Sequence, residues 1–397
     1  MANKKLKTVI IRLSAGINES VGGDDPFAAP DLIGKALKEA GGSEGLSLTI
    51  DEMSVDEIES ISRENGVVSA VPEMPFVQIK PNNIAAALPA IGVSNWGIGA
   101  IGAEGWDETI GSEAIVAVLD TGIDKNHAAF AGMQLITKNF TQDVDEDTDG
   151  HGTHCAGTIF GRDVDGARIG VARGVQKAII GKVLSAQGGS TQTIYDGLNW
   201  AVSQQAHVIS MSLGIDFPQF REDLKDRGYV DLEATAIALS AYRENIRLFD
   251  ALVDAYNKGA GAVRTPLLIG AAGNESNRPN YTIATSPPAA ADGLISVGAL
   301  DQNKDPAFFS NTDPDLSAPG VDIISAKAGG GLISMSGTSM AAPHVAGIAA
   351  GIVDFRLKAG ETVNPRKVSF ELMKAIEKLP HSRKAVGEGL AKATTGL

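Results

Sequence analysis

Short, fully apolar runs separated by longer amphipathic segments characterise the chain beyond about residue 95. The runs lie at 114–119, 208–213, 266–272 and 294–300. Continuous apolar runs, rather than alternating ones, are typical of strands that are covered on both faces, as in parallel sheets. The pattern therefore predicts an α/β fold with a mostly parallel sheet between two layers of helices.

The first 79 residues follow a different pattern, which predicts a small α+β domain. The expected elements are a strand at 6–13, a helix at 30–42, a strand at 46–53, a helix from Ser54 to Asn65 and closing strands within 66–79. Ser54 is expected to cap its helix, with Glu57 completing a capping box. Two strand–helix pairs and closing strands describe a compact unit that is separate from the large sheet.

Two further segments divide the chain. Residues 80–94 are rich in Pro, Asn and Ala, which is typical of a linker, and residues 95–397 then form the main domain. Within that domain, 215–250 is long for a connection between strands. Apolar residues recur at helical spacing over 232–256, so we expect a helical insertion built of one long helix or two.

Composition narrows the class of protein. An apolar fraction of 43% indicates a packed core, and no apolar run reaches the length of about 18 residues that a membrane span requires. The formal charge of −14, from 34 basic and 48 acidic residues, argues against nucleic acid or an anionic membrane as the main partner. The chain is expected to be soluble.

Cysteine content and the N-terminus bear on location. A single cysteine, Cys155, excludes an internal disulfide framework. The apolar stretch at 8–13 is short and is broken by Arg12, so it does not match a secretory signal. We therefore expect a cytoplasmic protein, or a secreted one if a signal has been removed.

Three motifs place an Asp, a His and a Ser in structural contexts that suit nucleophilic catalysis. Asp120 ends an apolar strand in AVLDTGID, His151 follows a glycine turn in DGHGTHCAG, and Ser339 lies where a loop becomes a helix in SGTSMAAPHVAG. A serine needs a base to remove its proton, and the base needs a carboxylate to orient it. Taken singly, these residues could be a turn residue, half of a His151–His154 metal pair and a helix cap. Together, and in this order, they indicate a triad.

The strings HGTHCAG and GTSMAAPHVAG, together with AAGNE at 271–275, closely resemble the motifs of the subtilisin-like serine proteases. The resemblance covers roughly residues 95–355. It implies the three-layer α/β/α fold of that family and a role for Asp120 in orienting His151, which acts as base and then acid for Ser339. It also implies that Asn274 donates to the oxyanion beside the backbone N–H of Ser339.

The same resemblance implies how substrate binds. Proteases of this family add the substrate as a β-strand between two enzyme segments. Here Ser212, Leu213 and Gly214 match one segment, and Gly188, Gly189 and Ser190 match the other. The substrate is a polypeptide, and its backbone supplies most of the pairing.

Residues 1–94 resemble the inhibitory propeptide of these proteases, so this chain's own N-terminal domain is a second expected partner. Its C-terminal tail would lie in the cleft, and residues 80–94 would contain a self-cleavage site. The predicted function is that of a serine endopeptidase made as an autoinhibited zymogen.

The chemistry needs no cofactor, and we predict no metal site. The positions that hold the family's strongest calcium site are Ala129 and Val164 here, and the acidic stretch 143–149 lacks EF-hand spacing. Cys155 is expected to be a small buried side chain, with a redox-sensitive thiol as the alternative.

Two other functions stay open from the sequence. A related enzyme could join peptides instead of hydrolysing them, with the insertion excluding water from the acyl-enzyme. A catalytically silent peptide-binding protein could retain the same fold, although it would not need all four of the implied catalytic residues.

Overall fold

The computed structural model describes residues 4–13, 46–81, 83–84, 95–258 and 265–394 of the 397-residue chain. Its central feature is a large sheet with the strand order β17-β18-β14-β13-β12-β10-β6-β8-β7. The pairs from β18 to β7 are parallel, and β17 pairs antiparallel with β18. The strands are β6 Ile115–Asp120, β7 Gln134–Asn139, β8 Lys177–Lys182, β10 Val208–Met211, β12 Leu267–Ala271, β13 Leu294–Leu300, β14 Leu316–Pro319, β17 Ile376–Glu377 and β18 Leu390–Ala391.

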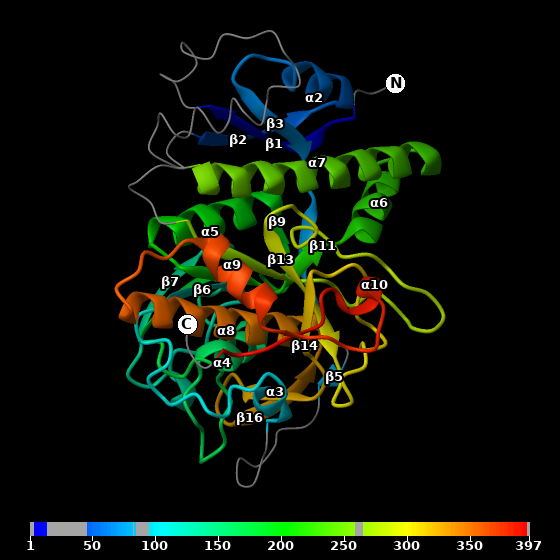
Figure 1. The fold of residues 1–397 in the computed structure, drawn as a ribbon. Helices are drawn as coiled ribbons and strands as arrows, with labels where there is room; N and C mark the ends of the chain where they lie inside the picture. Colours follow the sequence, from blue (N-terminus) through cyan, green and yellow to red (C-terminus); the bar gives the residue numbers. More distant parts are fainter. Residues whose placement is uncertain (1–3, 14–45, 82, 85–94, 259–264, 395–397) are drawn as a thin grey trace.

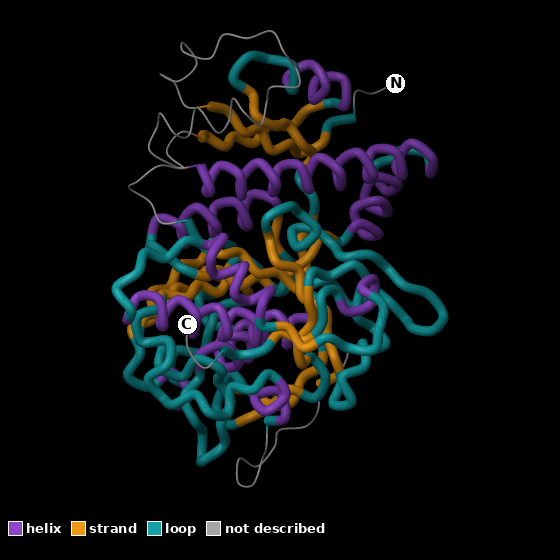
Figure 2. The backbone as a smooth tube through the Cα atoms, viewed as in Figure 1, coloured by secondary structure: helices purple, strands orange, loops and turns teal. Residues whose placement is uncertain are grey.

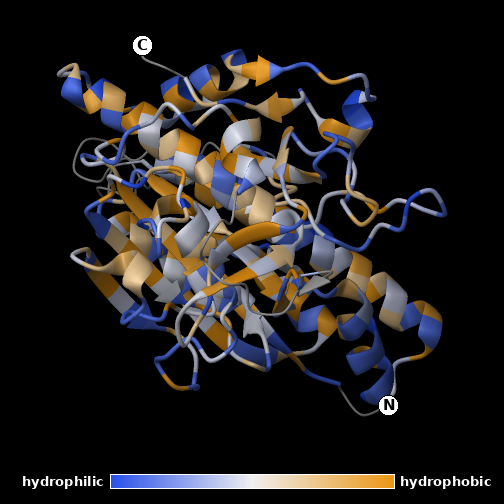
Figure 3. Cartoon of the chain, turned by 90° about the horizontal axis from the view of Figure 1, so that it is seen from below, coloured by the Kyte–Doolittle hydropathy of each residue, from blue (hydrophilic) through white to orange (hydrophobic). Residues whose placement is uncertain are grey.

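Side chains of the central strands enter two separate cores, which explains their unbroken apolar runs. Val116 and Val118 of β6 pack in one core, whereas Ala117 and Leu119 pack in the other. Both sets are buried because helices cover both faces of the sheet. In Figure 3, hydrophobic and intermediate colours prevail in the middle of the molecule, and hydrophilic colours lie mostly toward its outside. The predicted three-layer α/β fold with a mostly parallel sheet is confirmed.

Helices α5 and α7 lie on one side of the sheet and α4 and α8 on the other (Figures 1 and 2). The described helices of this domain are α3 Trp96–Ala100, the short 3₁₀ turn η2 Ala128–Phe130, α4 His151–Phe160, α5 Thr191–Ser203, α6 Phe217–Asp226, α7 Asp231–Lys258, α8 Thr338–Lys358, α9 Pro365–Lys374 and α10 Arg383–Val386. The described residues contain no helix that is both long and apolar enough to cross a membrane.

A small sheet of the order β2-β1-β3 forms the N-terminal region, together with helix α2. Its elements are β1 Leu6–Leu13, β2 Leu46–Met53, α2 Val55–Ile61 and β3 Val67–Pro72. The predicted capping box is confirmed: Glu57 N–H donates to the Ser54 side chain, and the Glu57 carboxylate accepts from Ser54 N–H. The expected helix at 30–42 lies outside the described residues.

The closing strands predicted within 66–79 separate into two environments. Strand β3 completes the N-terminal sheet, but β4 Pro75–Gln78 leaves it and lies between β11 Leu213–Ile215 and β9 Gly189–Ser190. The next paired segment, β5 Asn83–Ile84, adds to the hairpin of β15 Ile323–Ala326 and β16 Leu332–Ser336. We call residues 74–81 the tail.

Residues 215–250, where we expect a helical insertion, contain α6 and most of α7. Asp216 caps α6 by accepting from the backbone N–H of Gln219, and the apolar pattern over 232–256 belongs to one helix, α7. In Figure 1, α7 lies between the N-terminal sheet and the rest of the molecule. The insertion is therefore part of the surface on which the N-terminal region rests.

Candidate active site

The end of β6 and the start of α4 bring Asp120 and His151 together. Asp120 is the last residue of its strand and His151 the first of its helix. Asp120 Oδ1 lies 2.7 Å from His151 Nδ1, and the two side chains are 1% and 0% exposed. A buried carboxylate at this nitrogen fixes the ring orientation and leaves Nε2 to face a nucleophile.

The electrostatics of this pair favour a charged imidazolium. Burial alone lowers the pKa of His151, but the nearby Asp120 carboxylate outweighs it, so the pKa lies well above its ordinary value. The same carboxylate would stabilise the imidazolium that forms when His151 accepts a proton.

A brace of hydrogen bonds, which sequence reasoning missed, holds the two segments in register. Gly152 N–H donates to Thr121 Oγ1 over 2.9 Å, and Thr121 Oγ1 donates to Asp147 Oδ1 over 2.8 Å. Asp147 Oδ1 also accepts from Gly150 N–H, and its Oδ2 accepts from the N–H and hydroxyl of Thr153. Because Thr121 follows Asp120 and Gly152 follows His151, the brace ties together the two neighbours of the Asp–His pair.

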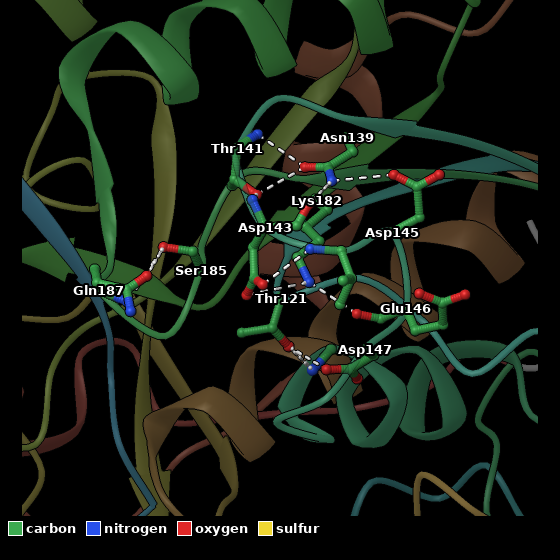
Figure 4. A network of polar contacts seen from close by, with 12 residues as sticks. Thr121, Asn139, Thr141, Asp143, Asp145, Glu146, Asp147, Lys182, Ser185 and Gln187 are labelled. Carbon is green, nitrogen blue, oxygen red and sulfur yellow. Dashed lines mark hydrogen bonds and ion pairs between the residues drawn. The ribbon is translucent and has the colours of Figure 1, made fainter.

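Lys182 supports the loop that carries Asp147. The lysine is 3% exposed, and its Nζ donates to the Glu146 carbonyl over 2.8 Å, with Asp143 Oδ2 at 3.9 Å (Figure 4). A buried ammonium needs such acceptors. The acidic stretch 143–149 is therefore partly anchored by a buried cation.

Ser339 lies in the first turn of α8, which begins at Thr338. Its Oγ donates to the Ile79 carbonyl over 2.9 Å. Among the described residues, Nε2 of His151 has no hydrogen-bond partner. The Ser339 hydroxyl thus faces a peptide carbonyl of the tail instead of His151.

Asn274 follows strand β12 and is anchored by Thr338. The Asn274 Oδ1 accepts from the backbone N–H and the hydroxyl of Thr338, each over 2.9 Å. This fixes the amide so that Nδ2 donates to the Lys80 carbonyl over 2.9 Å. The amide is a neutral donor aimed at a peptide carbonyl, which is the arrangement an oxyanion hole requires.

The residues implied to bind substrate border the tail on both sides. On one side, Leu213 pairs with Gln78 and Gly214 with Val77, and Ile79 N–H points to the Ser212 carbonyl over 3.4 Å. On the other side, Gly189 pairs with Phe76 and Ser190 with Pro75.

Gly188 completes the second side. It has a φ of +90°, and a Cβ there would lie 2.5 Å from the Phe76 carbonyl oxygen. Only glycine allows this close approach without strain. The two enzyme segments therefore hold an extended chain by its backbone.

Cys155 and His154 lie near the pair without joining it. Cys155 Sγ is 4.0 Å from His151 Nδ1 and donates to the Ser339 carbonyl over 3.3 Å, and burial raises the pKa of its thiol. A buried thiol with a raised pKa is unreactive, which favours the packing role. His154 Nε2 bonds to the Ile323 carbonyl, and burial lowers the pKa of His154 to about 3.

The positions of the family's strongest calcium site do not fit the ion. Ala129 and Val164 are buried and carry no side-chain oxygen. Val164 instead forms a backbone bridge with Ala167. Calcium prefers six to eight oxygen ligands, so these residues cannot hold it in the family's way.

Comparison with known proteins places this geometry in a family. A profile of the subtilase family, Peptidase_S8, matches residues 111–389. The chain is 34% identical over 301 residues to an intracellular serine protease of Paenibacillus polymyxa, covering 73% of this chain and 82% of that protein. It is 33% identical over 297 residues to the major intracellular serine protease of Bacillus subtilis, covering 72% and 82%.

A third relative is fungal. Subtilisin-like protease 6 of Arthroderma gypseum is 32% identical over 280 residues, which is 68% of this chain and 60% of that protein. The profile match spans more than half of the chain and includes β6, α4 and α8. On this evidence the chain belongs to the subtilase family of serine proteases.

Proposed function

We propose that the chain is an endopeptidase that cleaves polypeptides through an acyl-enzyme on Ser339 and that its own tail blocks the cleft until the chain is processed. The observation that supports this most directly is an extended chain lying between β9 and β11, with a carbonyl 2.9 Å from Ser339 Oγ, beside the buried Asp120–His151 pair.

The catalytic steps follow from the positions of these groups. Ser339 Oγ attacks the carbonyl carbon of a bound peptide and passes its proton to His151 Nε2. The oxyanion accepts hydrogen bonds from Asn274 Nδ2 and the backbone N–H of Ser339. His151 then protonates the departing amine, and a water molecule releases the acyl group by the reverse sequence.

The tail lies in a geometry that does not support attack. Ser339 Oγ addresses the carbonyl of Ile79, whereas Asn274 Nδ2 addresses the carbonyl of Lys80. Attack needs the nucleophile and the oxyanion donor on the same carbonyl. Neither the Ile79 nor the Lys80 carbonyl is contacted by both side chains, so the tail acts as a blocking strand. The self-cleavage site proposed within 80–94 lies largely outside the described residues.

Action inside the cell is part of the proposal. Two relatives are named intracellular serine proteases, and the lone Cys155 rules out an internal disulfide. Fractionation of the producing cells, with the processed chain followed by mass, checks this, and recovery from the medium alone would contradict it.

The first test is the intact mass after treatment with a fluorophosphonate, for the wild type and for Ser339→Ala. We expect one adduct and loss of the N-terminal region in the wild type, and neither in the variant. Ser336→Ala, which changes a nearby serine in β16, is the matched control and should label like the wild type. A processed chain without an adduct would contradict the endopeptidase proposal and favour a protein that only binds peptides.

Product analysis separates hydrolysis from peptide joining. A peptide with a free N-terminus is incubated with processed, unlabelled wild-type enzyme, and the masses of the products are recorded. Hydrolysis adds one water to each cleaved bond, whereas transpeptidation gives joined or cyclic products without it.

A further inference from the structure

The inserted helix α6 lies beside the N-terminal end of the tail, whereas Ser339 and Asn274 contact residues near its C-terminal end. Asp216, which directly follows β11 and caps α6, donates its backbone N–H to the Pro75 carbonyl over 3.0 Å. The edge that pairs with the tail therefore continues past Ile215 into the insertion. A substrate strand bound here would gain one more backbone hydrogen bond.

Thr191 supplies the next contact. Met74 N–H donates to Thr191 Oγ1 over 3.3 Å, and Thr191 Oγ1 donates to Asn245 Oδ1 over 3.0 Å. Asn245 is fully buried in α7 and donates to the Ala241 carbonyl over 2.8 Å. This chain of bonds orients the hydroxyl so that its lone pair faces the backbone of the bound strand.

Between Glu73 and Met74, the hydrogen-bond partners of the backbone change from the N-terminal sheet to the protease domain. Glu73 N–H still donates to Lys7 in the N-terminal sheet, over 2.8 Å. From Met74 onward, the backbone bonds go to Thr191, Asp216 and the two flanking strands of the protease domain. The groups that hold residues 74 and 75 therefore remain in place when the N-terminal region is removed.

An apolar wall adjoins these backbone contacts. Met74 is fully buried, and Phe220 and Leu224 of α6 are 7% and 1% exposed. A cavity of about 230 Å³ adjoins Met74 and Pro75. Its lining from the protease domain is Gly189, Ser190, Phe220, Asp223, Leu224 and Arg227, and Leu6, Lys7 and Glu73 line it from the N-terminal region. The space would accept an apolar side chain at least as large as that of methionine.

We propose that α6 and Thr191 form an additional substrate subsite, which recognises an apolar residue five positions before the residue whose carbonyl meets Ser339. The substrate class is a polypeptide that extends at least six residues on the amino side of the cut. This inference rests on the proposed function, because the tail stands for the substrate.

The test compares two peptide aldehydes on the processed wild-type enzyme, Ac-Phe-Val-Gln-Ile-H and Ac-Met-Pro-Phe-Val-Gln-Ile-H. Each adds the Ser339 hydroxyl across its C=O group, so no turnover is needed. We expect the longer aldehyde to have a Ki about tenfold lower, since it adds the backbone bond from its Met N–H to Thr191 and a buried side chain, whereas the acetyl carbonyl of the shorter one already faces Asp216 N–H. N-methylation of its Met nitrogen, or Asp in place of Met, should remove most of that gain.

Two variants of Thr191 test whether this residue of the enzyme provides the gain in affinity of the longer aldehyde. Thr191→Val removes the acceptor, and Thr191→Ser keeps it, so the ratio of the two Ki values should fall severalfold only in the valine variant, which retains the contribution of the buried side chain. Phe220→Ala should reduce the preference for Met over Asp. Equal Ki values for both aldehydes on the wild type would overturn the subsite. Inhibition by neither aldehyde would instead count against the proposed function.

Discussion

The two halves of the catalytic site differ in how complete they are. The Asp120–His151 half is assembled, with a 2.7 Å contact in a fully buried setting. In the other half, Ser339 is diverted to the Ile79 carbonyl, and the Asn274 amide contacts a different carbonyl. The first half depends only on groups within the protease domain, whereas the second depends on what occupies the cleft. If the tail inhibits the enzyme as proposed, its release would leave the Asp120–His151 pair unchanged.

The largest effect should come from the assembled half. Asp120→Asn keeps the shape but removes the charge that stabilises the His151 imidazolium, so we expect kcat to fall by about 10⁴-fold. Because Asp120 raises the pKa of His151, its loss lowers that pKa, and the acid limb of the kcat–pH profile should move to lower pH. Asp107→Asn, at an exposed surface carboxylate, is the control. An unmoved acid limb would contradict this account.

Asn274 tests the diverted half. Its amide donates to the Lys80 carbonyl, so removal of the amide should loosen the tail and impair the proposed chemistry. Asn274→Ala should lower kcat by about 10²–10³-fold with a small change in KM, since the donor matters most for the transition state. Steady-state kinetics on the processed enzyme measure both constants. A loss confined to KM would assign Asn274 to ground-state binding.

The hydrogen bonds from Gly152 through Thr121 to Asp147 predict that a change outside the triad can misplace the Asp120–His151 pair. Thr121→Val deletes the hydroxyl that links Gly152 to Asp147, and we expect kcat to fall about tenfold. Thr121→Ser retains the hydroxyl and should restore most of the rate. The variants are compared by kcat and by the acid limb of the pH profile, which a purely structural role would leave in place. Equal rates in both variants would remove Thr121 from the positioning network.

The smallest effect should concern release of the tail. Phe76 is fully buried, and its ring meets that of Phe249 in α7 at 6.0 Å. Phe76→Ala removes this anchor, so the lag before activity appears should shorten by a few fold, with no change in the final rate. Val77→Ala, at a half-buried neighbour, should alter the lag much less. Equal lags in the two variants would show that Phe76 does not anchor the tail.

Local sequence signals were sufficient for many elements. The apolar runs predicted β6, β10, β12 and β13, and the Ser54–Glu57 pair predicted the capping box of α2. These features depend on residues within a few positions of one another. The same holds for the placement of His151 and Ser339 at helix starts, because the N-caps Gly150 and Gly337 lie one and two residues before them.

Other features depend on contacts that no local pattern encodes. The local pattern did not separate segment 75–78 from the N-terminal sheet, and only the resemblance to a propeptide implied a tail in the cleft; its pairing with β9 and β11 comes from the structure. The brace joins Thr121 to Asp147 across 26 positions, although the polar residues beside the Asp and His motifs were a signal that could have pointed to it.

By itself, the sequence determined the fold class, the helical insertion, and the residues that could serve as nucleophile, base and carboxylate, because strand burial, helix capping and reactive groups are properties of short segments. The tertiary structure alone decided which carbonyl each catalytic group meets. That choice depends on strand register over residues far apart in the chain, where Ser339 meets Ile79 across 260 positions while Asn274 meets Lys80. Register is fixed by the packing of whole strands and side chains, and a shift of one residue exchanges every contact.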